Sequence, residues 1–136
     1  MLNFFTSNPK KTLIFIVEDD IEYSSALEQY LLQKFPEKTD VKSFPTGELC
    51  LLNLHLNPDF IILDDVLNSV YPNAQEGFDI LQQIKIKHPD TTILLLSSQK
   101  NIHVAFRTMK EFESIYIYKD EAAFENIKNS IDESLS

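Results

Sequence analysis

Residues 13–20 read LIFIVEDD, and this stretch decides the fold. Its first five residues form a continuous apolar run, which is typical of a strand buried on both faces of a parallel sheet. Three acidic side chains, Glu18, Asp19 and Asp20, follow the run directly. In an open α/β sheet, ligands bind just beyond the carboxyl ends of such strands. The stretch therefore predicts a buried strand that delivers carboxylates to a binding site.

Four more strand-like runs follow, and each has a helical pattern after it. They lie at residues 41–44, 59–63, 92–96 and 115–118. Five consecutive β-α units predict a parallel sheet with helices on both faces, because right-handed crossovers place them there. We expect the flavodoxin-like α/β fold, a (βα)5 three-layer sandwich whose five-stranded sheet has the order 2-1-3-4-5. Strand 1 then lies beside strand 3, so Asp19 and Asp64 become neighbours.

Polar side chains also close three of the later runs. Asp64 and Asp65 end the third run, Ser97 ends the fourth, and Lys119 follows the fifth. Carboxylates crowded at one edge of a sheet repel one another, and a hard cation such as Mg²⁺, which prefers oxygen ligands, relieves that repulsion. An aspartate in such a site can act as a nucleophile toward phosphorus, while an ammonium ion and a hydroxyl stabilise the phosphoryl oxygens. The pattern predicts a site for Mg²⁺ and a phosphoryl group.

Composition limits the other classes of function. The chain has 136 residues and a net charge of −9, so we expect one domain that binds neither nucleic acid directly nor an anionic membrane. Residues 1–11 place a basic pair after an aromatic pair, unlike a signal peptide, and we expect a flexible lead-in there and one domain over 12–136. The single cysteine, Cys50, lies in an apolar stretch and predicts a buried thiol and a cytoplasmic protein.

Five motifs along the chain together resemble one known family. They are VEDD at 17–20, PDFIILD at 58–64, EGFDIL at 76–81, LLSS at 95–98 and YIYK at 116–119. In this order and at these spacings, the chain resembles a response-regulator receiver domain, the chemotaxis-regulator-like module of two-component signalling. The resemblance runs from Leu13 to about Ser134. It implies a phospho-acceptor signalling domain and not an enzyme, with weak autophosphatase activity.

The resemblance also implies a role for each acidic residue. Asp64 would accept a phosphoryl group from a phosphohistidine on a histidine kinase or a histidine phosphotransfer protein. Asp19 would bind Mg²⁺ directly and Glu18 through water, with Asp64 and the backbone carbonyl of Val66 as further ligands. Mn²⁺ is the alternative ion.

Ser97, Tyr116 and Lys119 would contact or follow the phosphoryl group. The Ser97 hydroxyl would turn toward this group, and the Tyr116 side chain would follow it inward. Lys119 would bridge the phosphate and the acidic pocket. For Tyr116, the alternative is a purely structural packing role. Phosphorylation would then remodel the surface of helix 4, strand 5 and helix 5. Apolar side chains there, Phe106, Phe112, Tyr116 and Tyr118, would contact a target protein or a second copy in a homodimer.

Two departures from the family pattern keep an alternative open. Asp120 stands where the family usually has proline after the lysine, so we expect a trans peptide bond, because a non-proline cis bond costs roughly 2.5–4 kcal/mol. The loop between Asp64 and Gly77 is longer than usual, and Asp65 adds negative charge beside the acceptor. The alternative function is a pseudo-receiver, a binding module that is never phosphorylated.

A third class of function, a phosphohydrolase of the haloacid-dehalogenase type, is disfavoured. Such an enzyme needs its nucleophile after the first strand, whereas this chain has its best candidate after the third.

We see no effector segment after the last helix. A chain complete as given would act as a stand-alone receiver; in a longer regulator, a linked effector would set the output.

Overall fold

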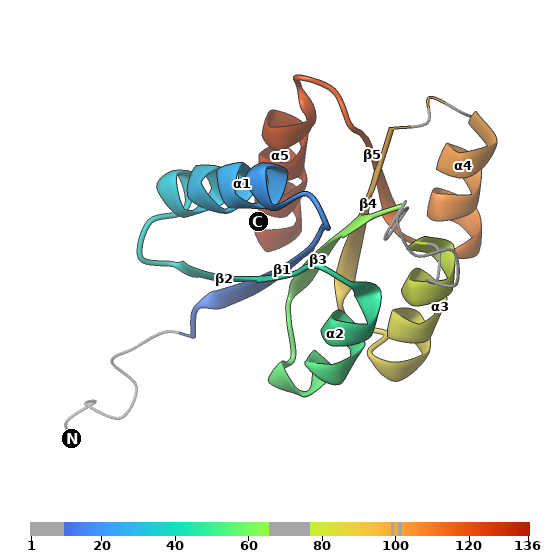
Figure 1. The fold of residues 1–136 in the computed structure, drawn as a ribbon, viewed down its shortest axis with the longest axis horizontal. Helices are drawn as coiled ribbons and strands as arrows, with labels where there is room; N and C mark the ends of the chain where they lie inside the picture. Colours follow the sequence, from blue (N-terminus) through green and yellow to red (C-terminus); the bar gives the residue numbers. More distant parts are fainter. Residues whose placement is uncertain (1–9, 66–76, 99, 101) are drawn as a thin grey trace.

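A computed structural model describes residues 10–65, 77–98, 100 and 102–136. The strands are β1 (Thr12–Val17), β2 (Thr39–Phe44), β3 (Phe60–Asp64), β4 (Thr92–Ser97) and β5 (Ile115–Tyr118). The helices are α1 (Ile21–Lys34), α2 (Gly47–Leu52), α3 (Gly77–Lys87), α4 (Ile102–Phe106) and α5 (Ala123–Leu135). The strands pair in parallel in the order β2-β1-β3-β4-β5 (Figure 1), which confirms the predicted fold class and strand order.

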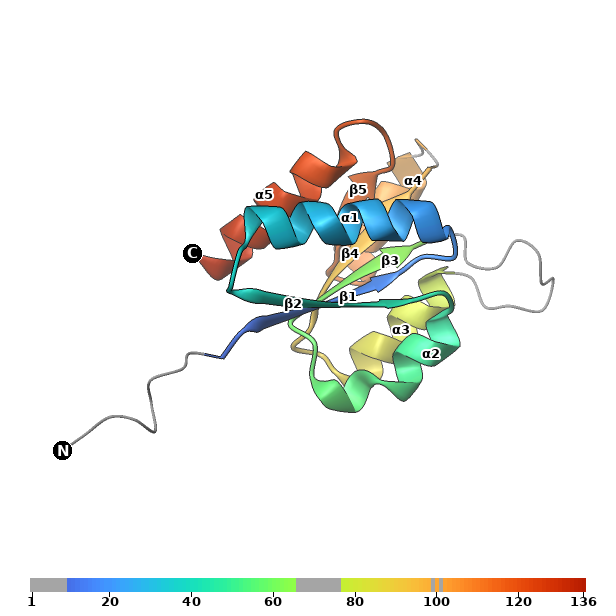
Figure 2. The ribbon, with the colours of Figure 1, turned by 60° about the vertical axis from the view of Figure 1, so that its left-hand side comes forward.

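The helices form two layers around the sheet. In Figures 1 and 2, α1 and α5 lie together on one face, and α2 and α3 lie on the other. Successive strand residues point to opposite faces, so Phe15 and Ile16 are both buried but belong to different cores. Fully burying a side chain of this size contributes roughly 1.5–3 kcal/mol. The continuous apolar runs of the strands are thus explained by helices on both sides.

Side-chain caps begin the first two helices. Asp20 caps α1, where its Oδ1 accepts a hydrogen bond from the Tyr23 amide at 3.1 Å, and the Thr46 hydroxyl caps α2 in the same way. Asp120 does not cap the last helix, although aspartate is a residue type that favours such a position. Helix α5 begins at Ala123 without a side-chain cap, and Asp120 instead accepts from the Ala122 amide at 2.9 Å, within the turn before the helix. The peptide bond between Lys119 and Asp120 is trans, as predicted.

Helix α4 differs from the other helices in what it buries. Three apolar residues of this segment are largely exposed: Ile102 at 79%, Phe106 at 60% and Met109 at 58%. The helix continues as a π-helical turn, Arg107–Glu111, a form that is rare and often found at functional sites. Phe112, expected on the same surface, stacks instead on Phe78 of α3 with ring centroids 5.3 Å apart. The apolar face of α4 therefore points outward, and Phe112 does not belong to it.

Three other expectations meet the structure in different ways. Cys50 is fully buried, as predicted, and burial raises the pKa of its thiol to about 12. Within the described parts of the chain, no helix has the length and apolarity needed to cross a membrane. The lead-in at 1–9 and most of the long loop after Asp64 lie outside the described residues, so the expectations about them stay predictions.

Candidate functional site

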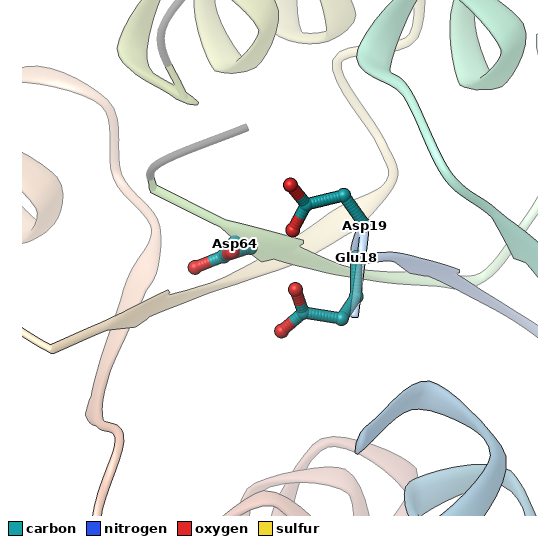
Figure 3. Close-up of side chains that lie close together, drawn as sticks. All are labelled: Glu18, Asp19 and Asp64. Carbon is teal, nitrogen blue, oxygen red and sulfur yellow. The ribbon is translucent and has the colours of Figure 1, made fainter. Parts of the chain in front are cut away.

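Three carboxylates meet where β1 and β3 end. Asp64 is the last residue of β3, and the β1–β3 register pairs Val17 with Leu63, so the next residue, Glu18, lies opposite Asp64. Figure 3 shows Glu18, Asp19 and Asp64 gathered beyond these two strands, and carboxylate oxygens of all three lie within 4.8 Å of one another. Glu18 and Asp64 are buried, whereas Asp19 is half-buried. The predicted neighbours are therefore brought together.

Lys119 reaches this cluster from the end of β5. Its Nζ donates a hydrogen bond to Glu18 Oε1 at 2.6 Å and lies 3.8 Å from Asp64 Oδ2. Its backbone amide donates to the Ser97 carbonyl at 2.7 Å, which fixes where the side chain starts. Burial by itself would lower the pKa of Lys119, but the Glu18 hydrogen bond and the Asp64 carboxyl outweigh it and raise the pKa. The group is therefore an ammonium ion at neutral pH.

Asp64 has the most perturbed carboxyl of the cluster. Burial and then the nearby Glu18 carboxylate raise the pKa of Asp64 from 3.8 to about 8, and Lys119 only partly opposes them. The cause is physical: a carboxylate loses hydration in the interior and is repelled by a second negative charge. In the protein alone, Asp64 therefore keeps its proton at neutral pH. A cation placed among these oxygens favours the ionised form.

The donor set fits a magnesium ion. Three carboxylates provide only oxygen ligands, and Mg²⁺ is usually bound by one or two carboxylates together with waters and phosphate oxygens. Val66, whose carbonyl the resemblance assigned to the metal, lies outside the described residues. The described histidines do not form a second cluster of this kind, since the single such group found in that part of the chain is Glu18, Asp19 and Asp64.

Tyr23 belongs to the site but was missed by the sequence analysis. Its ring lies under Lys119, with Nζ 4.4 Å from the ring centroid, and this cation–π contact stabilises the ammonium position. Its hydroxyl is buried and has no hydrogen-bond partner among the described residues. Burial raises the pKa of Tyr23. The available signal was spacing, because Tyr23 comes four residues before Leu27 and extends the apolar face of α1.

The Ser97 side chain lies beside that of Asp65. The β3–β4 register pairs Asp64 with Leu96, so the following residues, Asp65 and Ser97, share the opposite face of the sheet. The Ser97 hydroxyl donates to Asp65 Oδ2 at 2.5 Å. Tyr116 is half-buried, and its side chain hydrogen-bonds to Ser97; burial raises the pKa of Tyr116, and the Ser97 contact partly offsets the rise. The sequence indicated only the charge of Asp65 and not this contact.

Comparison with known proteins is consistent across sequence and fold. A family model described as the response regulator receiver domain matches residues 14–132. The regulatory protein LuxO of two Vibrio vulnificus strains, YJ016 and CMCP6, is 28% identical over 105 residues, which is 76% of this chain and 21% of each relative. The chain thus spans about a fifth of the length of these relatives.

Solved structures share the fold at low sequence identity. A CheY-like receiver domain protein from Methanospirillum hungatei JF-1 superposes with a TM-score of 0.76 at 19% identity, covering 93% of this chain and 94% of that one. The signal receiver domain of an HD domain-containing protein from Pseudomonas fluorescens Pf-5 gives 0.76 at 20% identity, covering 98% and 93%. At these identities the likeness concerns the fold.

Proposed function

This chain belongs to the response regulator receiver domain family of two-component signalling, and on that premise we propose that Asp64 accepts a phosphoryl group in a Mg²⁺-dependent reaction. The observation that carries the proposal is the geometry around Asp64. Its carboxyl lies within 4.8 Å of the Glu18 and Asp19 carboxyls and 3.8 Å from the Lys119 ammonium. The Lys119 ammonium, together with a cation held by the carboxylates, would stabilise the three oxygens of a phosphoryl group on Asp64.

The transfer itself exchanges one bond for another. A carboxylate oxygen of Asp64 forms a bond to phosphorus while the nitrogen–phosphorus bond of a phosphohistidine breaks, and the histidine nitrogen keeps the electron pair. The donor we propose is a histidine kinase or a histidine phosphotransfer protein. Lys119, held by Glu18 at 2.6 Å, presents a fixed positive charge to the incoming phosphoryl oxygens. Such preorganised charge requires no rearrangement during the reaction.

The metal site of the proposal consists of carboxylates at the ends of β1 and β3. Glu18, Asp19 and Asp64 would hold Mg²⁺, or Mn²⁺ as the alternative ion, with the Val66 carbonyl as a further ligand. When bound, the ion supplies positive charge that favours the ionised form of Asp64 and neutralises the phosphoryl oxygens. Slow hydrolysis of the acyl phosphate by water at the same site is the weak autophosphatase activity that we propose. The domain would signal and would not act as an enzyme on another substrate.

The output surface that we propose runs over α4, β5 and α5. The exposed apolar residues Ile102, Phe106 and Met109 lie on α4 and its π-helical turn. Tyr116 and Tyr118 of β5 line a groove of about 340 Å³ beside them. Tyr116 also contacts Ser97, so a change at Ser97 reaches this groove directly. A target protein would dock here, with a homodimer of phosphorylated chains as the second occupant; direct nucleic-acid binding and a location outside the cytoplasm are not expected.

Intact mass after incubation with acetyl phosphate tests the proposal. We expect wild type to gain one phosphoryl group in the presence of Mg²⁺ and not in EDTA, and Asp64→Asn to gain none. Asp65→Asn serves as the matched control, because it changes the neighbouring carboxyl and leaves the proposed acceptor in place. A folded wild type that gains no mass and does not bind beryllofluoride would refute the proposal and favour the pseudo-receiver.

A further inference from the structure

We propose that Asp65 is a positioning residue that holds the Ser97 hydroxyl on the far side of the sheet from Asp64. In this arrangement, phosphorylation must break the Asp65–Ser97 hydrogen bond before the hydroxyl turns to the phosphoryl group. The inference rests on the proposed function, because it concerns the same acceptor. It gives Asp65, and its hydrogen bond with Ser97, a role that the function of Asp64 as acceptor does not require.

The hydrogen bond between the two side chains is short and buried. Ser97 Oγ donates to Asp65 Oδ2 at 2.5 Å, with Ser97 fully buried and Asp65 8% exposed. Hydrogen bonds to a carboxylate are roughly twice as strong as neutral ones. The second carboxylate oxygen, Oδ1, is buried and has no partner among the described residues. Within that part of the chain, the Ser97 hydroxyl is therefore the donor that compensates a buried charge.

The backbone holds Asp65 in this position. Its amide donates to the Leu96 carbonyl at 2.9 Å, and its carbonyl accepts from the Gly77 amide at 2.9 Å. The space beside it is closed, since a Cβ added at Gly77 would lie 2.5 Å from the Asp65 Cα. Because β3 and β4 are paired through Asp64 and Leu96, the Asp65 side chain lies on the face of Ser97. The contact thus follows from the sheet register and not from a flexible surface encounter.

Tyr116 connects the same contact to the proposed output surface. Its side chain interacts with Ser97, whose hydroxyl donates to Asp65. The three side chains form a chain from Tyr116 through Ser97 to Asp65, and moving the Ser97 hydroxyl toward Asp64 breaks both links. Asp65 in this way favours the unphosphorylated arrangement of Ser97 and Tyr116 together.

By holding the Ser97 hydroxyl, Asp65 lowers the apparent affinity for a phosphoryl mimic that needs this hydroxyl turned toward Asp64. The affinity falls in proportion to the population of the chain in which the hydroxyl is turned that way. Beryllofluoride with Mg²⁺ is the probe, because it occupies the place of a phosphoryl group without covalent transfer. We expect Asp65→Ala to lower the dissociation constant for beryllofluoride about tenfold, the effect of losing one strong hydrogen bond in the resting state. Asp65→Asn keeps a neutral oxygen acceptor of the same shape, so its affinity for beryllofluoride should lie between those of wild type and Asp65→Ala.

The deciding measurement repeats the substitution without the serine hydroxyl. Removing the charge of Asp65 strengthens anion binding equally in both backgrounds, so that effect cancels in the comparison. If Asp65 acts through Ser97, the gain from Asp65→Ala in wild type should exceed the gain in Ser97→Ala by about fivefold or more. Equal gains in the two backgrounds would overturn the inference, because they would show an effect of charge alone.

Titration calorimetry gives the dissociation constants, and far-UV circular dichroism checks that each variant is folded. Should Asp65→Ala not fold, Asp65→Asn in the two backgrounds provides the same comparison, with an expected excess of about threefold. Wild type that fails to bind beryllofluoride would count against the proposed function itself. Wild type that binds, with no excess gain, would count against the role of Asp65 only.

Discussion

Replacing Asp64 by asparagine tests the electrostatics of the acidic cluster without any phosphoryl chemistry. The carboxyl is 6% exposed, with Glu18 beside it and Lys119 3.8 Å away. Its pKa is about 8 in the folded protein against an ordinary value of 3.8. Asparagine has nearly the same shape and no charge at any pH. The variant therefore removes the titration and leaves the packing in place.

The direction of the pH effect follows from the higher pKa in the folded state. Below about pH 4 the carboxyl is protonated whether the chain is folded or unfolded, and its contribution to stability is fully present. As the pH rises, the unfolded chain releases this proton and the folded protein keeps it, so stability falls until about pH 8. Between about pH 4 and 7 the loss amounts to about 4 kcal/mol, at about 1.4 kcal/mol for each pH unit.

Urea unfolding in EDTA, followed by circular dichroism from about pH 4 to 8, measures this loss. Across that wider range we expect wild type to lose about 5 kcal/mol more unfolding free energy than Asp64→Asn, because asparagine cannot ionise. Asp90→Asn, at an exposed position, should follow the wild-type curve. Adding Mg²⁺ should recover stability in wild type more than in Asp64→Asn. Parallel curves for wild type and Asp64→Asn in EDTA would refute the assigned electrostatics.

Three further predictions test other contacts. Gly77→Ala should destabilise the protein by about 1–3 kcal/mol in urea unfolding, because its Cβ would lie 2.5 Å from the Asp65 Cα; unchanged stability would contradict this close contact. Lys119→Met should lower the unfolding free energy by about 3 kcal/mol in EDTA, since it leaves the buried Glu18 carboxylate without its 2.6 Å partner, and a loss near zero would count against a structural ion pair. The Cys50 thiol, whose pKa burial raises to about 12, should not react with a thiol reagent at about pH 8 until the protein is unfolded in urea; fast labelling of the native protein would show that it is accessible.

Much of the fold was predictable because its signals are local. Each predicted strand run became a strand of the sheet, and the alternation of strands and helices limited the topology to a parallel sheet. Local signals failed where two structures satisfy the same pattern. Asp120 suits a helix cap by type, but α5 begins only at Ala123, after a further turn. The apolar spacing of Ile102, Phe106 and Met109 correctly indicated a helix, but spacing does not show whether that face meets a core or solvent.

For the site, local sequence was enough to place Glu18, Asp19 and Asp64 at strand ends, because each of them comes directly after a continuous apolar run or one residue later. Tertiary structure alone decided which groups pair. Lys119 and Glu18 are 101 residues apart and meet at 2.6 Å, and the Ser97 hydroxyl donates to Asp65. The physical reason is the register of the sheet. Hydrogen bonds between strands from distant parts of the chain determine which side chains share a face, and a shift of one residue would move every side chain of a strand to the other face.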